Sequence, residues 1–216
     1  MEENRALLCR IGGLLYERGH VVGHDGNVSV RLEGDRILIT PSGVCKGRME
    51  PDMMVLCDLE GNVLEGDRYP SSEIAMHLEV YRGRPDVNGI VHAHPPAATA
   101  FAICGRGLEE RYLIETISGL GQVPVAPFGM PSTPEVAESI RPYLAGHSAV
   151  LLANHGALTW GKDVWQAFDR MEVLEQTAKV YAQVQLMGGG VELSPEQVEA
   201  LLALSGRYEA LAQKRT

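Results

Sequence analysis

The 216-residue sequence lacks the features of several large classes of protein. It has no apolar run near the ~20 residues that a transmembrane helix needs, and its first ten residues, with Glu2, Glu3 and Arg5, do not form a signal-peptide pattern. It also has no low-complexity tract, which excludes the disordered and fibrous classes. We therefore expect a globular, cytoplasmic protein that does not act at a membrane.

Positive charge is scarce as well, because 19 lysines and arginines stand against 28 acidic residues and give a formal net charge of -9. Without a long basic cluster, we expect no sequence-independent binding to nucleic acid or to an anionic membrane surface. The four cysteines, Cys9, Cys45, Cys57 and Cys104, form no C-x-x-C pair and predict neither a thiolate zinc site nor a disulfide framework. An anionic substrate would need positive charge from a metal ion, helix ends or single lysines.

The sequence does contain alternating helix and strand patterns, without an internal repeat or a linker. Apolar residues at helical spacing predict a first helix over residues 3–18, and segments 27–31 and 36–40 predict a hairpin. The other predicted elements are a hairpin at 54–62, strands at 89–94, 122–126 and 149–152, and helices at 73–82, 97–104, 163–187 and from 134 and 195 onward. We predict a single α/β domain, residues 1–216, with mostly hairpin connections.

Two histidines at strand spacing, His92 and His94, follow the apolar run 89–91. In a strand, side chains two residues apart point to one face, so both imidazoles can converge on a metal ion. His155 follows the predicted strand 149–152 and would complete a three-nitrogen site if the strands lie close together. The alternative is two unrelated histidines and a hydrogen-bonded loop residue. The remaining histidines are interpreted as structural: His20, His24, His77 and His147.

A carboxylate and several small polar residues each have two interpretations. Glu73, in the first turn of a predicted helix, either favours the helix dipole or acts as a general base beside a metal ion. Ser71 and Ser72 are N-cap residues that can also bind an anion at the start of that helix. Lys46 is either solvated or adds positive charge near the anion. Three more residues are turn residues or parts of a phosphate site: Asn27, Ser42 and Gly43.

Taken in order, these motifs resemble the class II aldolase/adducin family over nearly the whole chain. The matching motifs are Gly26-Asn27-Val28-Ser29, Ile39-Thr40-Pro41-Ser42-Gly43, Ser71-Ser72-Glu73, His77, Val91-His92-Ala93-His94 and Asn154-His155-Gly156. The resemblance implies a central, largely antiparallel sheet between helical layers, in a homotetramer with active sites at subunit contacts. It favours the aldolase branch, because related 4-epimerases have Asp where this chain has Glu73.

The same resemblance implies a lyase of carbohydrate metabolism that cleaves a phosphorylated ketose, similar to L-fuculose 1-phosphate, to dihydroxyacetone phosphate and an aldehyde. The implied cofactor is one Zn²⁺ per subunit, with Mn²⁺ or Co²⁺ as alternatives. The implied metal ligands are His92, His94, His155 and Glu73, the last of which is also the proton-transfer base. The implied phosphate ligands are Asn27, Ser42, Gly43, Ser71 and Ser72.

Two tyrosines match the family only loosely. Aldolases of the family use a tyrosine of a neighbouring subunit to protonate the aldehyde-derived oxygen. Tyr112 stands near that position, and its alternative is a core tyrosine; Tyr208 resembles the carboxyl-terminal tyrosine of the family. The alternative functions are a sugar-phosphate epimerase, dehydratase or decarboxylase, and a non-catalytic adducin-like interaction module. The presence of all four implied metal ligands disfavours the interaction module.

Overall fold

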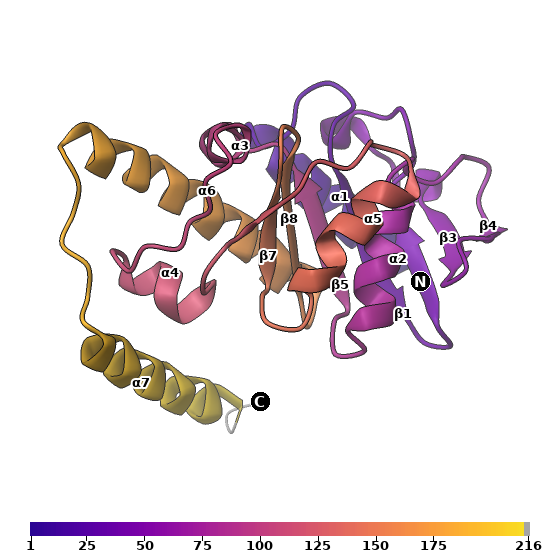
Figure 1. Ribbon diagram of the computed structural model, residues 1–216. Coiled ribbons are helices and arrows are strands. Elements are labelled where there is room, and N and C mark those ends of the chain that lie inside the picture. The colour runs from indigo at the N-terminus through magenta and orange to yellow at the C-terminus, as the bar shows by residue number, and fades with distance from the viewer. Residues whose placement is uncertain (214–216) are drawn as a thin grey trace.

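A computed structural model describes residues 1–213, with side chains up to residue 204. Its centre is an eight-stranded sheet with helices on both faces (Figure 1). The strands are β1 (Asn27–Leu32), β2 (Arg36–Ile39), β3 (Val55–Asp58), β4 (Val63–Glu65), β5 (Gly89–Ala93), β6 (Val125–Ala126), β7 (Ala149–Leu152) and β8 (Gly156–Gly161). They lie in the order β4-β3-β2-β1-β5-β8-β7-β6, and among these described strands only the β6–β7 pair is parallel.

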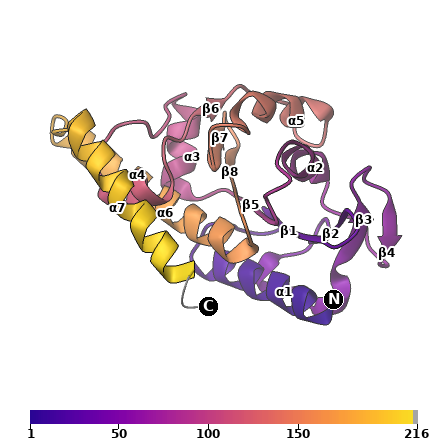
Figure 2. The same cartoon turned by 90° about the horizontal axis from the view of Figure 1, so that it is seen from below.

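Two helical layers enclose the sheet. The helices are α1 (Glu2–Glu17), α2 (Ile74–Gly83), α3 (Pro96–Ile103), α4 (Ile114–Gly119), α5 (Pro134–Ile140), α6 (Val164–Leu186) and α7 (Pro195–Gln213), with 3-10 turns at Lys46–Arg48, Pro51–Met53 and Arg141–Tyr143. α1, α3 and α6 pack on one face and α2 and α5 on the other (Figure 2). This confirms the predicted fold class, a largely antiparallel sheet between helical layers.

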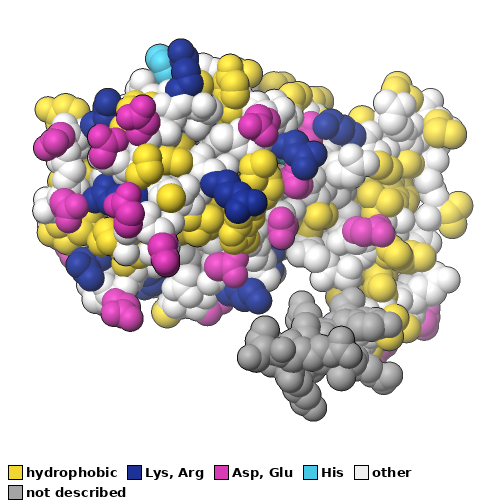
Figure 3. Space-filling model, turned by 180° about the vertical axis from the view of Figure 1, so that it is seen from behind, with side chains coloured by type: hydrophobic (Ala, Val, Ile, Leu, Met, Phe, Trp, Pro, Cys, Tyr) yellow, Lys and Arg dark blue, Asp and Glu magenta, His cyan; other side chains and the backbone are white. Residues whose placement is uncertain are grey.

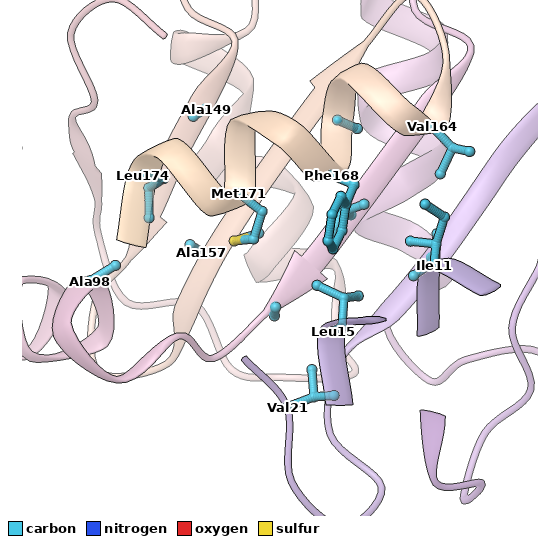
Figure 4. Close-up of a cluster of buried hydrophobic side chains, with 14 of the residues drawn as sticks. Ile11, Leu15, Val21, Ala98, Ala149, Ala157, Val164, Phe168, Met171 and Leu174 are labelled. Atoms are coloured by element: carbon cyan, nitrogen blue, oxygen red, sulfur yellow. The ribbon is translucent and has the colours of Figure 1, made fainter. Parts of the chain in front are cut away.

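Each face of the sheet has its own apolar core. On the first face, Ile11 and Leu15 of α1 lie near Phe168 and Met171 of α6, above the sheet (Figure 4). Burial of each such side chain contributes about 1.5–3 kcal/mol to folding. The second core includes Trp160, which is fully buried. Because successive side chains of a strand alternate between these faces, each strand fixes which of its residues face α2.

The predicted helix ends are largely confirmed. The capping box at the start of α7 is present, since Ser194 N–H donates to Gln197 Oε1 at 2.8 Å and Gln197 N–H donates to Ser194 Oγ at 3.3 Å. Thr133 caps α5 by accepting a hydrogen bond from Glu135 N–H. Within the described residues, no helix combines the length and apolar character needed to cross a bilayer.

Three strand and helix assignments need correction. β8 and α4 were not predicted from the sequence, and the predicted strand 122–126 is reduced to Val125–Ala126. Pro124 has no N–H to donate to a ladder, and the preceding Val123 forms only an isolated bridge with Leu108. The missing β8 matters most for function, because it lies between β5 and β7.

Candidate active site

Three histidines meet at one end of β5 and β8. One ring nitrogen from each of His92, His94 and His155 lies within 4.8 Å of the other two. The three ring centroids are 4.8 to 4.9 Å apart. His92 is fully buried, whereas His94 and His155 are half-buried. The structure therefore brings together the three histidines that the sequence suggested as a ligand set.

The turn before β8 places His155 beside the other two rings. β8 pairs with β5, with Ala157 opposite Ala93, so the residue just before β8 reaches the end of β5. The sequence required the strand that precedes His155 to lie near β5; that strand is β7, which is separated from β5 by β8, the strand with which it pairs. A Cβ on Gly156 would lie 2.5 Å from both Ala93 O and His94 Cδ2, so this approach requires glycine.

Glu73 faces this cluster from the start of α2. It is the N-cap residue of α2 and not, as predicted, a residue of its first turn. Its Oε2 lies 3.1 Å from His92 Nε2, and its Oε1 lies 3.3 Å from His155 Nε2. Asn27 of β1, directly opposite His92 in the sheet, donates its Nδ2–H to Glu73 Oε2 at 3.0 Å. The carboxylate is thus held from two strands and one turn.

The environment of Glu73 favours its ionised form. Burial of the carboxyl group raises its pKa, but the His92 and His155 imidazoles and the Asn27 amide outweigh burial and lower it well below the usual range. Burial, together with the neighbouring His92 and His155, lowers the pKa of His94 to about 4. The pKa of His155 is lowered as well, first by burial and then by His92. At neutral pH the Glu73 carboxylate therefore lies beside the mainly uncharged imidazoles of His94 and His155.

This donor set fits a divalent cation. His92 Nδ1–H donates to Ala157 O at 2.9 Å, so a His92 ring with a single proton directs its Nε2 lone pair toward Glu73 and toward His94 Nε2, 3.1 Å away. Acceptor atoms this close repel one another unless a proton or a cation lies between them. Glu73 Oε1 has no hydrogen-bond donor among the described residues. Three imidazole nitrogens and a carboxylate are a set that Zn²⁺ and similar ions accept.

A polar cavity of about 310 Å³ opens beside the cluster. The predicted site residues that line it are Asn27, Ser42, Gly43, Ser71, Ser72, Glu73, His94 and His155. Two hydrogen bonds hold its two small-residue loops together: Ser42 N–H donates to Tyr69 O at 3.0 Å, and Ser71 N–H donates to Thr40 O at 3.1 Å. The backbone N–H groups of Gly43 and Ser72 have no partner among the described residues. These free donors and the serine hydroxyls suit an anion.

Lys46 adds a cation to the wall of this cavity. Its side chain is only 2% exposed, and Nζ donates to Val44 O at 2.7 Å and to His24 O at 3.1 Å. Of its two sequence interpretations, the solvated one is therefore wrong. Burial lowers the pKa of Lys46 to about 8, which leaves the ammonium group mostly charged at neutral pH.

The predicted catalytic tyrosine lies elsewhere. Tyr112 is half-buried and packs edge-on against Tyr181 of α6, with ring centroids 5.2 Å apart. It does not line the cavity beside the histidines. The side chain of Tyr208 lies outside the described residues. Within one chain, the structure therefore does not bring Tyr112 to the site.

His77 is a residue that the sequence interpretation left as structural. It is fully buried on α2, where Nε2–H donates to Asn27 Oδ1 and Nδ1 lies 2.7 Å from Ser29 Oγ. It therefore stands directly behind the residue that bonds Glu73. Its spacing of four residues from Glu73, one helical turn, could have indicated a shared face.

A larger cavity of about 640 Å³ lies along α6 and contains none of the predicted site residues. Its wall includes buried His20, whose two ring nitrogens have no partner among the described residues, and Glu175, which accepts from Ala97 and Ala98 N–H. Its arginine and lysine are paired with glutamates, Arg18 with Glu172 and Lys179 with Glu175. Because these charges are balanced, the larger cavity favours no particular ligand. The cavity of about 310 Å³ is the candidate site, because it adjoins the histidine cluster.

The sequence and the fold are similar to those of known proteins. The sequence model of the class II aldolase and adducin N-terminal domain matches residues 6–182. The chain is 38% identical over 186 residues to 3-oxo-tetronate 4-phosphate decarboxylase of Haemophilus influenzae, covering 84% of this chain and 88% of that protein. It is 34% identical over 178 residues to L-fuculose phosphate aldolase of Methanococcus maripaludis, covering 80% and 91%. A solved structure of L-fuculose 1-phosphate aldolase superposes with a TM-score of 0.88 at 34% identity, covering 94% and 96%.

Proposed function

Because the chain belongs to the class II aldolase and adducin family, we propose that it is a metal-dependent lyase that cleaves a phosphorylated ketose to dihydroxyacetone phosphate and an aldehyde. The substrate is a ketose 1-phosphate similar to L-fuculose 1-phosphate. One observation carries the proposal: the Glu73 carboxylate lies 3.1 Å from His92 Nε2 and 3.3 Å from His155 Nε2, at the wall of a polar cavity.

His92, His94 and His155 would hold one divalent ion, with Glu73 as the fourth ligand before substrate binds. Zn²⁺ is the first candidate, and Mn²⁺ and Co²⁺ are the alternatives. When bound, the ion supplies Lewis-acid stabilisation of the negative charge that develops on the ketose oxygens as the carbon–carbon bond breaks.

Glu73 moves the proton at carbon. Cleavage breaks the bond between the carbon next to the ketone and the carbinol carbon that becomes the aldehyde. The electron pair stays on the ketone side, and Glu73, in its protonated form, delivers its proton to that carbon; in the reverse direction the Glu73 carboxylate removes the same proton. The hydroxyl proton on the aldehyde side goes to a second group, for which we propose the ionised phenolate oxygen of Tyr112 of the partner subunit. Transfer of this proton through solvent to Glu73 restores both groups.

The phosphate group would bind at the opposite side of the cavity, between its two small-residue loops. Ser42, Gly43, Ser71 and Ser72 supply hydroxyl and backbone N–H donors, and Lys46 supplies charge. Asn27 lines the same cavity and belongs to the proposed site, although its side-chain amide is already bonded to Glu73 and His77.

Decarboxylation is the second candidate, and the Haemophilus influenzae relative favours it. A 3-oxo-tetronate 4-phosphate is a β-keto acid, so loss of CO₂ would leave the same three-carbon phosphorylated fragment, with its electron pair beside the ketone. The same ion and Glu73 would serve both reactions. They differ at the leaving group, because CO₂ leaves without giving up a proton, whereas an aldehyde forms only when a hydroxyl proton is removed.

Product analysis separates the candidates. The purified protein, loaded with Zn²⁺, would be incubated with L-fuculose 1-phosphate, other ketose 1-phosphates and a 3-oxo-tetronate 4-phosphate. Dihydroxyacetone phosphate with an aldehyde supports the aldolase, and dihydroxyacetone phosphate with CO₂ supports the decarboxylase. An intact carbon skeleton indicates an epimerase or a dehydratase. No reaction with any of these phosphates, despite full metal loading, would contradict a lyase of this class.

Two variants test the assigned roles. Glu73→Gln should keep stoichiometric metal but lose about 10²- to 10⁴-fold in turnover, because an amide cannot transfer the proton. His94→Ala should lose both metal and turnover, because two of the three nitrogen ligands remain. Metal content by mass spectrometry and initial rates measure both effects, with Glu60→Gln as an exposed-carboxylate control. Normal activity with stoichiometric metal in His94→Ala would rule out the proposed site.

A further inference from the structure

A chain of hydrogen bonds runs through the core behind Glu73. Tyr81 Oη lies 2.8 Å from Ser29 Oγ, and Ser29 Oγ lies 2.7 Å from His77 Nδ1. His77 Nε2 bonds Asn27 Oδ1, and Asn27 Nδ2 lies 3.0 Å from Glu73 Oε2. The four groups behind Glu73 are all at most 2% exposed. β1 contributes Asn27 and Ser29, which are two residues apart and so share the face that packs on α2.

The direction of every hydrogen bond in this chain follows from its Glu73 end. The Asn27 NH₂ group faces Glu73 Oε2, because a carboxylate oxygen accepts, and Asn27 Oδ1 therefore faces His77 Nε2. That oxygen can only accept, so His77 Nε2 carries a proton. Burial lowers the pKa of His77 to about 3, and the ring is neutral.

The remaining bonds are then fixed as well. A neutral ring with a proton on Nε2 has a lone pair on Nδ1, so the Ser29 hydroxyl donates to it. Tyr81 O–H in turn donates to Ser29 Oγ. Each donor therefore points toward Glu73, and such a chain of aligned bonds strengthens its members in a buried site.

We propose that His77 is a positioning residue, which fixes the orientation of the Asn27 amide and, through it, the position of the Glu73 carboxylate. If the Asn27 amide were reversed, its Oδ1 would face the Glu73 carboxylate and its NH₂ group would face His77 Nε2–H. Both contacts would then be repulsive. The proposal rests on the proposed function, in which Glu73 moves the proton. It adds a residue that touches neither substrate nor metal.

The geometry predicts distinct effects for three variants. His77→Leu removes the N–H, lets the amide rotate and should lower kcat about 10- to 100-fold, the effect of one bond to a charged group, with KM and metal stoichiometry unchanged. His77→Gln keeps a donor near the Nε2 position and should restore most of kcat. In an Asn27→Ala background, His77→Leu should have little further effect, because the residue through which it acts is gone.

Kinetics, metal content and thermal unfolding of these variants test the proposal, with His147→Leu, a half-buried histidine outside this chain of hydrogen bonds, as the control. Wild-type kcat in His77→Leu would overturn it. So would equal loss in His77→Gln and His77→Leu, or additive loss in the double variant. If His77→Leu unfolds, the spectroscopic measurement below still decides.

A spectroscopic test does not depend on turnover. Nitrogen-15 NMR of the metal-loaded wild type should show the His77 proton on Nε2, and its resonance should shift in Asn27→Ala. A proton on Nδ1, or no shift, would overturn the proposal. Inactivity of the wild type toward every sugar phosphate would instead contradict the proposed function, so the two failures are distinguishable.

Discussion

At the scale of single residues, Glu73 and Lys46 place opposite charges at the same cavity. Each is mostly buried, and each is stabilised by hydrogen bonds to neighbouring groups. Glu73 is held ionised by imidazoles and an amide, which suits a group that removes a proton from carbon in the aldol-forming direction. Among the described residues, Lys46 Nζ bonds only backbone carbonyls, so its charge has no bonded counter-ion there and is available to a substrate anion.

Lys46 predicts a pH dependence of substrate binding. Its pKa is lowered to about 8 by burial, so the ammonium group loses its proton as the pH rises from 7 to 9. A phosphate monoester is already fully ionised in this range, because its second pKa is about 6. The KM for the phosphorylated substrate should therefore rise across this interval as the cation disappears, while kcat stays nearly constant. Steady-state kinetics at closely spaced pH values measure the effect.

A substitution distinguishes the effect of Lys46 on the pH profile of KM from the effects of other titrating groups. Lys46→Met should raise KM about 10- to 100-fold at pH 7, the cost of one charge-assisted hydrogen bond, and should flatten the KM profile. Lys162→Met, at an exposed lysine, serves as the control and should keep the wild-type profile. If Lys46→Met keeps the rise in KM between pH 7 and 9, another group is responsible.

At the scale of elements, the hairpin of β7 and β8 assembles the histidine cluster. Its turn holds His155 against the end of β5, and Gly156 allows this close approach because it has no Cβ.

Gly156→Ala should push the turn away from His94, weaken metal binding about 10- to 100-fold and destabilise the fold by about 1–3 kcal/mol. Metal titration and thermal unfolding measure both, with Gly146→Ala, where a Cβ has open space, as the control. Unchanged metal affinity in Gly156→Ala would show that the turn tolerates the shift.

The elements that the sequence predicted are those with strong local patterns. Amphipathic helices, capped starts and the two early hairpins follow from residue spacing, and the histidine pair follows from strand alternation. β8 was missed because Asn154-His155-Gly156 was interpreted as the end of the preceding strand. In addition, β8 is buried on both faces and therefore shows no alternation of apolar and polar residues. α4 was missed because Ile114–Gly119 is short and contains weak helix formers. A contact with a distant element stabilises it: the buried Thr116 hydroxyl bonds the Thr177 hydroxyl of α6.

Contacts between elements that are distant in the sequence could not be predicted from local residue patterns. The histidine spacing alone did not show that β8 would join β5, and so the meeting of His155 with His92 depended on the family resemblance. The role of Asn27 was also hidden, because it looks like a turn residue until its amide is seen between Glu73 and His77. The sequence separations of these contacts are 46 and 50 residues, which no local pattern encodes.

At the scale of the whole molecule, the end of α6, the following loop and α7 form an arm that projects from the body (Figures 1 and 3). Apolar side chains on this arm are exposed, including Leu186, Met187 and Val191, which is 96% exposed. Tyr112 lies against the loop of this arm, where a Cβ on Gly190 would lie 2.9 Å from its ring. An exposed apolar surface of this kind favours contact with another protein surface. We propose that it contributes to a homotetramer in which Tyr112 acts at the site of the partner subunit.

Mixed oligomers test this arrangement directly. Glu73→Gln and Tyr112→Phe should each be nearly inactive in aldol cleavage, since each removes one proton-transfer group. Co-expressed with different affinity tags and purified as mixed oligomers, they should regain activity, because a site that takes Glu73 from one subunit and Tyr112 from another can be intact. Random mixing in a closed ring leaves about one quarter of the sites intact. Recovery near that level supports a shared site, and sedimentation measures the oligomeric state. If mixed oligomers form but remain inactive, Tyr112 does not complete a neighbouring site.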